Sequence, residues 1–295
     1  MTGADQRSPA APTGTLSVVS TPIGNLSDVT LRALDVLRSV PLVAAEDTRL
    51  TRRLFERHGI ESRLVSYHAR SAEARTRELL DHLRGGRDLA LVTDAGTPGV
   101  SDPGGELVRL WAAEGGRVTA IPGASAVLAA VAVSGVAGPR WAFEGFLARR
   151  GRARREALTR IAADDRASVL FEAPNRVAAT LSDLATACGL NRAGAVCREL
   201  TKVHETISRG SLDELARMAA EGEIPPRGEF VIVVGYREPN GQRDEVRSGE
   251  VSLAEAAREV ESLVAEGVAR GEAARRVSAR TGIPRRAIYR PGRTA

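Results

Sequence analysis

The chain has 295 residues, 43% of them hydrophobic and 27% charged, with a formal net charge of +5. This is the composition of a soluble globular protein with room for two domains, each with its own core. No apolar run is long enough to span a bilayer. The two cysteines, Cys188 and Cys197, are too few for a disulfide framework and are not spaced as metal ligands, so we expect no metal site and a reducing compartment.

Residues 1–14 are polar and rich in Pro, Gly and Ala, without a signal peptide. We therefore expect a disordered lead-in to a cytoplasmic protein, with no membrane association.

Strands and helices alternate through the first half. A strand is predicted at Thr15–Ser20, then a helix capped by Ser27 or Asp28. Further strands are expected at 40–45, 63–67, 89–92 and 118–121, with helices at 48–58, 73–83, 106–114 and 127–133. This alternation is typical of an α/β domain with a mostly parallel sheet, here over residues 15–137.

In the second half, strands and helices do not alternate regularly. Strands are predicted at 141–146, 168–172, 193–198, 206–210 and 229–235, some of them joined by hairpins. We expect a second α/β domain with a mixed sheet over residues 138–240. Residues 241–295 are predicted to be a polar linker followed by helices. The end of this segment resembles a helix-turn-helix, in which Gly282 ends one helix and Pro284 starts the next.

Basic residues are concentrated in two places. Residues 270–295 carry arginines at 270, 275, 276, 280, 285, 286, 290 and 293 against one acid, Glu272, and a second cluster comprises Arg149, Arg150, Arg152, Arg154 and Arg155. Such clusters favour a polyanionic partner. The alternative is that arginine is the usual solubilising residue of this protein's source.

Three turns at strand ends of the first domain are rich in Gly, Pro, Ser and Thr. They cover residues 22–25, 96–102 and 122–126. Ligands of open α/β sheets bind at the carboxyl ends of strands, so neighbouring strands would bring these turns to one crevice suited to a nucleoside-like cofactor. A G-x-G-x-x-G dinucleotide motif does not follow the first strand, and the chain has no G-x-x-x-x-G-K-[ST] phosphate loop.

Eight segments in order carry a family resemblance: STPIGNLSDVTLRAL, EDTR, DAGTPGVSDPG, IPGASA, FEGFL, LFEAPNR, REL-TK-HE and RGEF. Over about Thr15 to Gly235 the chain resembles the 16S ribosomal RNA cytidine 2′-O-methyltransferase family, which has the tetrapyrrole-methylase fold of class III methyltransferases. The resemblance implies S-adenosylmethionine as cofactor, a decoding-centre cytidine of the small ribosomal subunit as substrate, and a homodimer.

The resemblance also implies which residues bind the cofactor. These are Ile23, Gly24, Gly96, Thr97, Val100, Ser125 and Ala126, together with Glu172 and Leu200 in the second domain. The tetrapyrrole enzymes usually have an aspartate where this chain has Thr97, which argues against assuming their substrate.

Methylation of a ribose hydroxyl is helped by a base, or by a cation that stabilises the alkoxide. Candidates at loop ends are Asp47, Asp102, Glu172, Lys202, His204 and Glu205. Lys202, His204 and Glu205 are the most suggestive group, with Asp47 as a further candidate. Asp47 could instead cap a helix, and the other three could be a solvated strand end.

An RNA substrate would need phosphate contacts and access to a splayed-out nucleotide. We expect the contacts from Arg49, Arg149, Arg150, Arg152, Arg154, Arg155, Arg275, Arg276, Arg285 and Arg286, and base stacking from Tyr67, Phe143 or Phe146. Two other hypotheses remain open: a tetrapyrrole precursor C-methyltransferase, and a nucleic-acid-binding protein whose helical tail is the working part.

Overall fold

A computed structural model describes residues 14–68, 72–237, 253–281 and 283–288. The chain divides into two compact units, Met1–Arg237 and Glu238–Ala295. Several predicted features lie outside the described residues: the lead-in over 1–13, the linker over 238–249, Gly282, Arg290 and Arg293.

The first sheet of unit 1 has five parallel strands in the order β3-β2-β4-β1-β5. The strands are β1 (Thr15–Val19), β2 (Leu42–Ala45), β3 (Arg63–Ser66), β4 (Leu89–Val92) and β5 (Arg117–Ile121). Helices α1 (Leu31–Ser39) and α2 (Thr48–His58) cover one face, and α3 (Ala72–Arg84) and α4 (Gly105–Ala113) cover the other. The strands are therefore buried on both sides, as their continuous apolar runs predict.

The second sheet of unit 1 has the order β6-β7-β10-β8-β9, with β6 and β7 parallel and the other pairs antiparallel. Its strands are β6 (Trp141–Phe146), β7 (Ala167–Glu172), β8 (Ala193–Arg198), β9 (Thr206–Ser211) and β10 (Phe230–Val234). Helices α6 (Arg152–Ala163), α7 (Val177–Cys188) and α8 (Leu212–Ala220) pack on one face. The predicted mixed sheet is confirmed.

Helix α5 (Ala126–Ser134) covers the other face of the second sheet, although it directly follows the last strand of the first. Val127 and Ala130 share a hydrophobic cluster with residues of β7, β8 and β10. Its sequence is apolar on all sides, but only the face with Val127 and Ala130 is buried, and Leu128 on the other side is 57% exposed.

The predicted start of the first helix was wrong. Asn25, not Ser27 or Asp28, caps a short 3-10 turn at Leu26–Asp28, where its side chain accepts a hydrogen bond from the N–H of Ser27. The α-helix begins only after Thr30, whose hydroxyl oxygen accepts from the N–H of Ala33 at 3.1 Å. A threonine with extended backbone is a good N-cap, and it takes precedence over the two polar residues before it.

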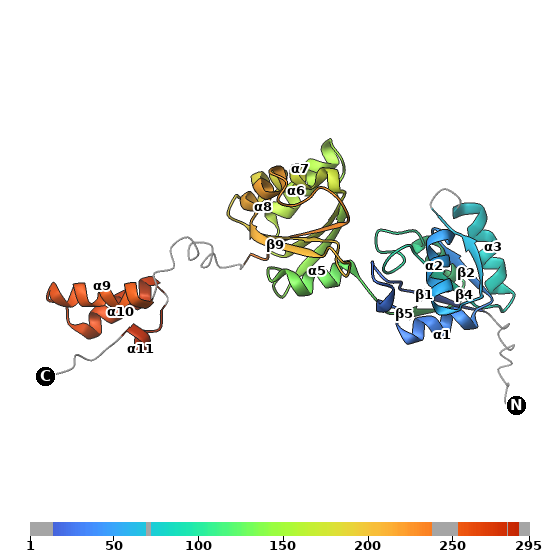
Figure 1. The fold of residues 1–295 in the computed structure, drawn as a ribbon, viewed down its shortest axis with the longest axis horizontal. Helices are drawn as coiled ribbons and strands as arrows, with labels where there is room; N and C mark the ends of the chain where they lie inside the picture. Colours follow the sequence, from blue (N-terminus) through green and yellow to red (C-terminus); the bar gives the residue numbers. More distant parts are fainter. Residues whose placement is uncertain (1–13, 69–71, 238–252, 282, 289–295) are drawn as a thin grey trace, which may run out of the picture. The chain divides into compact units, whose positions relative to one another are not determined.

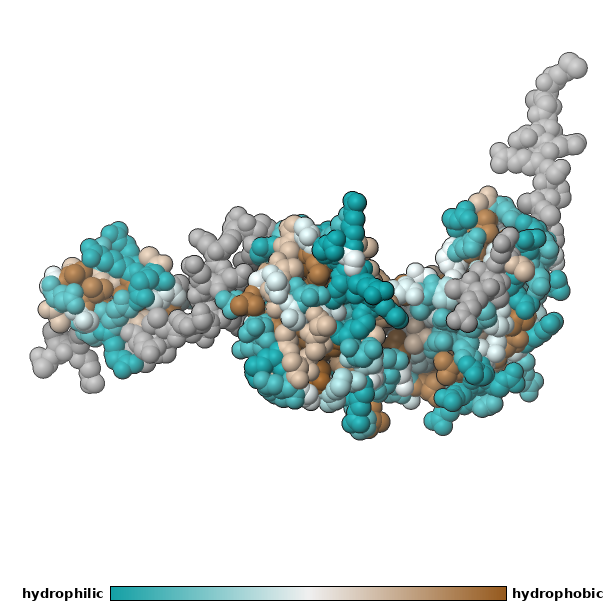
Figure 2. Space-filling model, turned by 90° about the horizontal axis from the view of Figure 1, so that it is seen from above, coloured by the Kyte–Doolittle hydropathy of each residue, from teal (hydrophilic) through white to brown (hydrophobic). Residues whose placement is uncertain are grey.

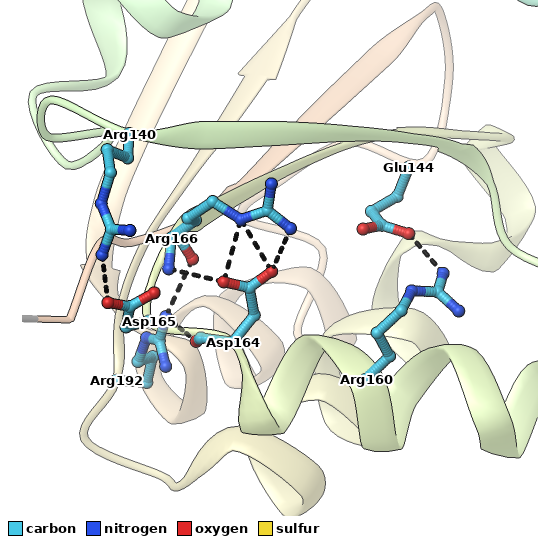
Figure 3. Close-up of polar contacts among 7 residues, drawn as sticks. All are labelled: Arg140, Glu144, Arg160, Asp164, Asp165, Arg166 and Arg192. Atoms are coloured by element: carbon cyan, nitrogen blue, oxygen red, sulfur yellow. Dashed lines mark hydrogen bonds and ion pairs between the residues drawn. The ribbon is translucent and has the colours of Figure 1, made fainter.

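A group of charged side chains closes the end of the second sheet where β7 begins (Figure 3). Arg192 is 6% exposed and donates to the backbone oxygens of Gly235, Asp164 and Arg166. The Asp164 carboxylate in turn pairs with the Arg166 guanidinium. Two further ion pairs lie beside it, Arg140–Asp165 and Glu144–Arg160. These charges hold strand ends together, and they lie at the opposite end of β7 from Glu172.

Unit 2 is a small helical body with its own core. It comprises α9 (Leu253–Ala265), α10 (Arg270–Thr281) and α11 (Arg285–Ile288), which bury alanine, valine and isoleucine side chains between them. As expected, a helix restarts after Pro284. Several of its arginines form exposed ion pairs with glutamates: Arg270–Glu261, Arg275–Glu272, Arg276–Glu272 and Arg280–Glu259.

Within the described residues, none of the helices is both long and apolar enough to cross a membrane. In the view of Figure 2 the coloured surface is predominantly hydrophilic, and hydrophobic residues appear as separate patches.

Candidate functional site

The three Gly-rich turns of the first sheet meet, as predicted. β1 lies between β4 and β5, so the turns that follow these strands are neighbours. Thr21 and Gly96 exchange two backbone hydrogen bonds of 2.8 and 3.0 Å, and the hydroxyls of Ser20 and Thr97 are 2.8 Å apart. On the other side the N–H of Ser20 donates to the carbonyl of Ile121. Backbone bonding between the turns fixes the shape of the crevice.

A cavity of about 440 Å³ opens where these turns face the second sheet. That volume lies within the range of about 300–1,000 Å³ that is usual for small-molecule sites. The first sheet contributes residues 23, 95–97 and 100–102, and the start of α5 contributes 125–127. The second sheet contributes residues 146, 171–174, 197, 200 and 228–231. Both sheets of unit 1 therefore build one site.

Eight of the nine predicted cofactor residues line this cavity: Ile23, Gly96, Thr97, Val100, Ser125, Ala126, Glu172 and Leu200. Gly96 has φ of +83°, a conformation that side chains with a Cβ rarely adopt, and this lets the chain turn back towards Thr21. Ser125 caps α5, where its hydroxyl accepts from the N–H of Leu128.

Gly24, the ninth, does not line the cavity. A Cβ built on it would lie 2.5 Å from Cγ of Lys202, so the glycine allows this lysine to pack against the first turn. The ammonium of Lys202 is held by Glu199 at 2.9 Å and by Glu229 at 3.0 Å. The role of Gly24 in the structure is close packing between the two sheets.

The side chains of Lys202, His204 and Glu205 do not form the expected catalytic group, and none of them lines the cavity. The Glu205 carboxylate accepts from the N–H of Thr201 at 2.7 Å, and the His204 carbonyl accepts from Arg198. These contacts shape the turn between β8 and β9. Leu200 is the residue of this turn that reaches the cavity.

Asp47, the further candidate base, is held in a local ion pair. It caps α2, and its carboxylate is gripped by the guanidinium of Arg49 at 2.5 Å. The hydrogen bond from the Arg49 side chain lowers the pKa of Asp47 to about 2. A carboxylate of such low basicity is a poor proton acceptor. The same pair ties down Arg49, a predicted RNA contact.

Asp102 is one of three acidic residues that line the cavity, with Glu172 and Glu229. It lines the cavity directly after Ser101, a non-glycine residue with φ of +65°. Burial raises the pKa of Asp102 to about 6, with a further contribution from the negative charge of Glu46, while a hydrogen bond with Thr93 opposes the shift. The sequence placed Asp102 among loop-end carboxylates, but only the structure separates it from Asp47, because burial is not visible in local sequence.

The predicted RNA contacts divide into exposed and buried residues. Arg149, Arg150, Arg152 and Arg155 are exposed. Arg154 is 9% exposed, and its guanidinium bonds Asp183, Thr180 and the carbonyl of Ala148. Arg154 is therefore a buried residue, unlike the other four arginines of this cluster, and its guanidinium is already paired within the fold.

The three predicted stacking residues differ in their exposure to solvent. Tyr67 is 2% exposed and hydrogen bonds Thr76, so it is a core residue. Phe143 packs edge-on against Phe171 inside the second sheet. Phe146, by contrast, is 56% exposed and lines the cavity.

Within the part of the chain that the structure describes, no group of three or more His, Cys, Asp or Glu side chains is arranged to hold a metal ion.

The model of the family "Tetrapyrrole (Corrin/Porphyrin) Methylases" matches residues 15–216. The chain belongs to the tetrapyrrole methylase family. This confirms the predicted fold class and the predicted methyltransferase class.

Curated proteins similar to the chain are named ribosomal RNA small subunit methyltransferase I. The protein of Synechocystis sp. is 44% identical over 94% of this chain and 96% of its own length. That of Micromonospora olivasterospora is 45% identical over 97% and 88%, and that of Bacillus subtilis 39% identical over 94% and 93%. The family expected from the eight motifs is confirmed.

Solved structures show the same fold at low sequence identity. A cobalt precorrin-4 methyltransferase has a TM-score of 0.58 at 20% identity, covering 75% of this chain and 94% of that one. A uroporphyrin-III C-methyltransferase from Thermus thermophilus, complexed with S-adenyl homocysteine, has a TM-score of 0.53 at 21% identity, covering 75% and 97%.

Proposed function

We propose that the protein transfers a methyl group from S-adenosylmethionine to the ribose 2′-hydroxyl of a decoding-centre cytidine in 16S ribosomal RNA. The observation that carries the proposal is the cavity shared by the two sheets, in a chain whose relatives over nearly its full length are named ribosomal RNA small subunit methyltransferase I. The target atom and nucleotide come from the motif resemblance.

The cavity suits S-adenosylmethionine by its size, and because backbone turns and apolar side chains line it. When bound, this cofactor supplies a methyl group on a sulfonium, which is already electrophilic. The turns at 96–102 and 122–126 bind it and orient the methyl group towards the hydroxyl.

Proton removal is assigned to Asp102 in this proposal. As the oxygen–carbon bond forms and the carbon–sulfur bond breaks, the hydroxyl proton passes to the Asp102 carboxylate, and the sulfur leaves as a neutral thioether. With a pKa of about 6, the carboxylate is mostly ionised at neutral pH and more basic than an ordinary aspartate.

The nucleotide is reached from the side of Phe146, whose exposed ring offers a stacking surface at the mouth of the cavity. Phosphates are contacted by the exposed arginines after β6 and by those of unit 2, Arg275, Arg276, Arg285 and Arg286. The assembly proposed is a twofold homodimer acting in the cytoplasm.

The test is methyl transfer to ribosomal RNA. The protein is incubated with tritiated S-adenosylmethionine and with small subunits from a strain that lacks the modification. Label in 16S ribosomal RNA, mapped by nuclease digestion to one cytidine and resistant to alkaline cleavage at its 3′ side, supports the proposal. Label in a porphyrin precursor and none in RNA would identify a tetrapyrrole C-methyltransferase instead.

Deleting the residues after Gly249 is expected to weaken RNA binding about tenfold or more, because nine arginines are removed against six glutamates, while the affinity for S-adenosylmethionine stays the same. Unit 1 keeps every residue that lines the cavity. Filter binding of small subunits and calorimetry of the cofactor measure the two affinities. Equal loss of both, or of neither, contradicts the role of unit 2 in RNA binding.

A further inference from the structure

A second hollow of about 440 Å³ adjoins the cofactor cavity. It is lined by Arg149, Arg154, Ala173, Asn175, Arg176, Ala179, Thr180 and Asp183. Ala173 lines both spaces, so the loop that follows β7 is their common wall.

The end of β6 runs along the same wall. Phe146 lies in the cofactor cavity, the carbonyl of Leu147 accepts from Arg176, and that of Ala148 accepts from Arg154. Arg149 then lines the hollow, and Gly151, with φ of +86°, turns the chain into α6. Four consecutive residues thus lead from one space to the other.

The floor of the hollow is a network of paired charges, of which Glu172 is fully buried and Asp183 is partly exposed. Arg154 bonds Asp183 and Thr180, the Thr180 hydroxyl donates to Glu172 at 2.6 Å, and Glu172 pairs with Arg176 at 3.2 Å. Because these groups satisfy one another, they form a fixed polar surface.

Arg149 differs from these arginines. Within the described part of the chain it has no hydrogen bond or ion pair with another residue, and it is exposed at the rim. Arg154 is paired with Asp183 and Arg176 with Glu172, so Arg149 supplies the unpaired positive charge of the hollow. An arginine with its planar fork of donors unused, beside charges that are already paired, suits a phosphate better than a neutral or cationic group.

We infer that this hollow binds the phosphodiester next to the methylated ribose, with Arg149 as the phosphate contact and Asn175 as a second donor. The inference rests on the proposed function, since it requires a nucleotide to enter the adjoining cavity. It explains how the chain places a ribose rather than a base beside the methyl donor: holding the neighbouring phosphate fixes the sugar between the two spaces.

The test compares Arg149→Gln with Arg63→Gln, which removes the same charge from an exposed position at the start of β3. Binding of a fluorescein-labelled cytidine RNA dodecamer is followed by anisotropy between 50 and 200 mM salt, with the cofactor affinity measured separately. Arg149→Gln is expected to weaken RNA binding about tenfold and to lower the salt slope by about one, while Arg63→Gln changes neither. Asn175→Ala is expected to weaken binding about threefold without changing the slope, because it removes no charge.

Equal RNA affinities for Arg149→Gln and Arg63→Gln would overturn the inference, as would a loss of cofactor affinity matching the loss for RNA. The anisotropy assay needs no methyl transfer. If the wild-type protein leaves 16S RNA unlabelled while Arg149→Gln still weakens RNA binding as expected, the proposed function is refuted and the phosphate site is retained.

Discussion

Replacing Asp102 by Asn is expected to lower kcat for methyl transfer by roughly 10²–10⁴-fold, the usual effect of losing a general base. Asn has nearly the same shape and can keep the contact with Thr93, so the affinity for S-adenosylmethionine should change little. Because Asp102 accepts a proton only when ionised, wild-type activity should rise with pH through about 6 and level off above it. Single-turnover transfer to small subunits from pH 5 to 8 measures both effects.

Asp94→Asn is the matched control. Asp94 accepts the N–H of Asp47 at 2.8 Å, and its charge contributes to the raised pKa of Asp102. This variant should keep the plateau rate and move the acidic limb to lower pH, since one negative charge is removed from beside Asp102. A variant that only folds less well would lower the rate at every pH and would not shift the acidic limb of the pH–rate profile. A kcat within threefold of wild type for Asp102→Asn would show that this carboxylate is not the base.

Replacing Glu172 by Ala is expected to destabilise unit 1 by about 3–5 kcal/mol, the usual cost of breaking a buried ion pair. The Glu172 side chain is fully buried and accepts from the N–H of Ala173 at 2.8 Å, from Thr180 and from Arg176. Its removal leaves the guanidinium of Arg176 with no compensating charge below the surface. Both tryptophans of the chain, Trp111 and Trp141, lie in unit 1, so urea unfolding followed by tryptophan fluorescence measures this unit specifically.

Glu156→Ala serves as the comparison, because Glu156 pairs with Arg152 on the exposed face of α6. An exposed pair of this kind contributes about 0–1 kcal/mol. If the two variants unfold at the same urea concentration, the buried network does not stabilise the second sheet as its geometry indicates.

The order of strands and helices and the three turns could be predicted from local sequence, because apolar runs and Gly-Pro clusters determine them within a few residues. Local sequence does not show which distant residues surround a given side chain in the fold. Thr30, rather than Ser27 or Asp28, is the N-cap of α1 because its backbone is extended and its hydroxyl accepts from the helix. The Arg154 side chain is buried because it bonds Asp183 and Thr180 on α7. Lys202, His204 and Glu205 are close in sequence, but Lys202 pairs with Glu199 and Glu229, the Glu205 carboxylate accepts from the N–H of Thr201, and none of the three lines the cavity.

Helix α5 also bears on how unit 1 folds. It begins at the cofactor cavity, directly after the first sheet ends, yet its buried face packs on the second sheet, where Ile23 of the first turn joins the same hydrophobic cluster. The second sheet therefore depends on α5 and Ile23, which follow strands of the first sheet, to cover one of its faces, and the cavity needs residues of both sheets. The two sheets are expected to unfold as a single cooperative unit, and on the ribosome the first 125 residues must wait for the chain as far as β10 before the site can close.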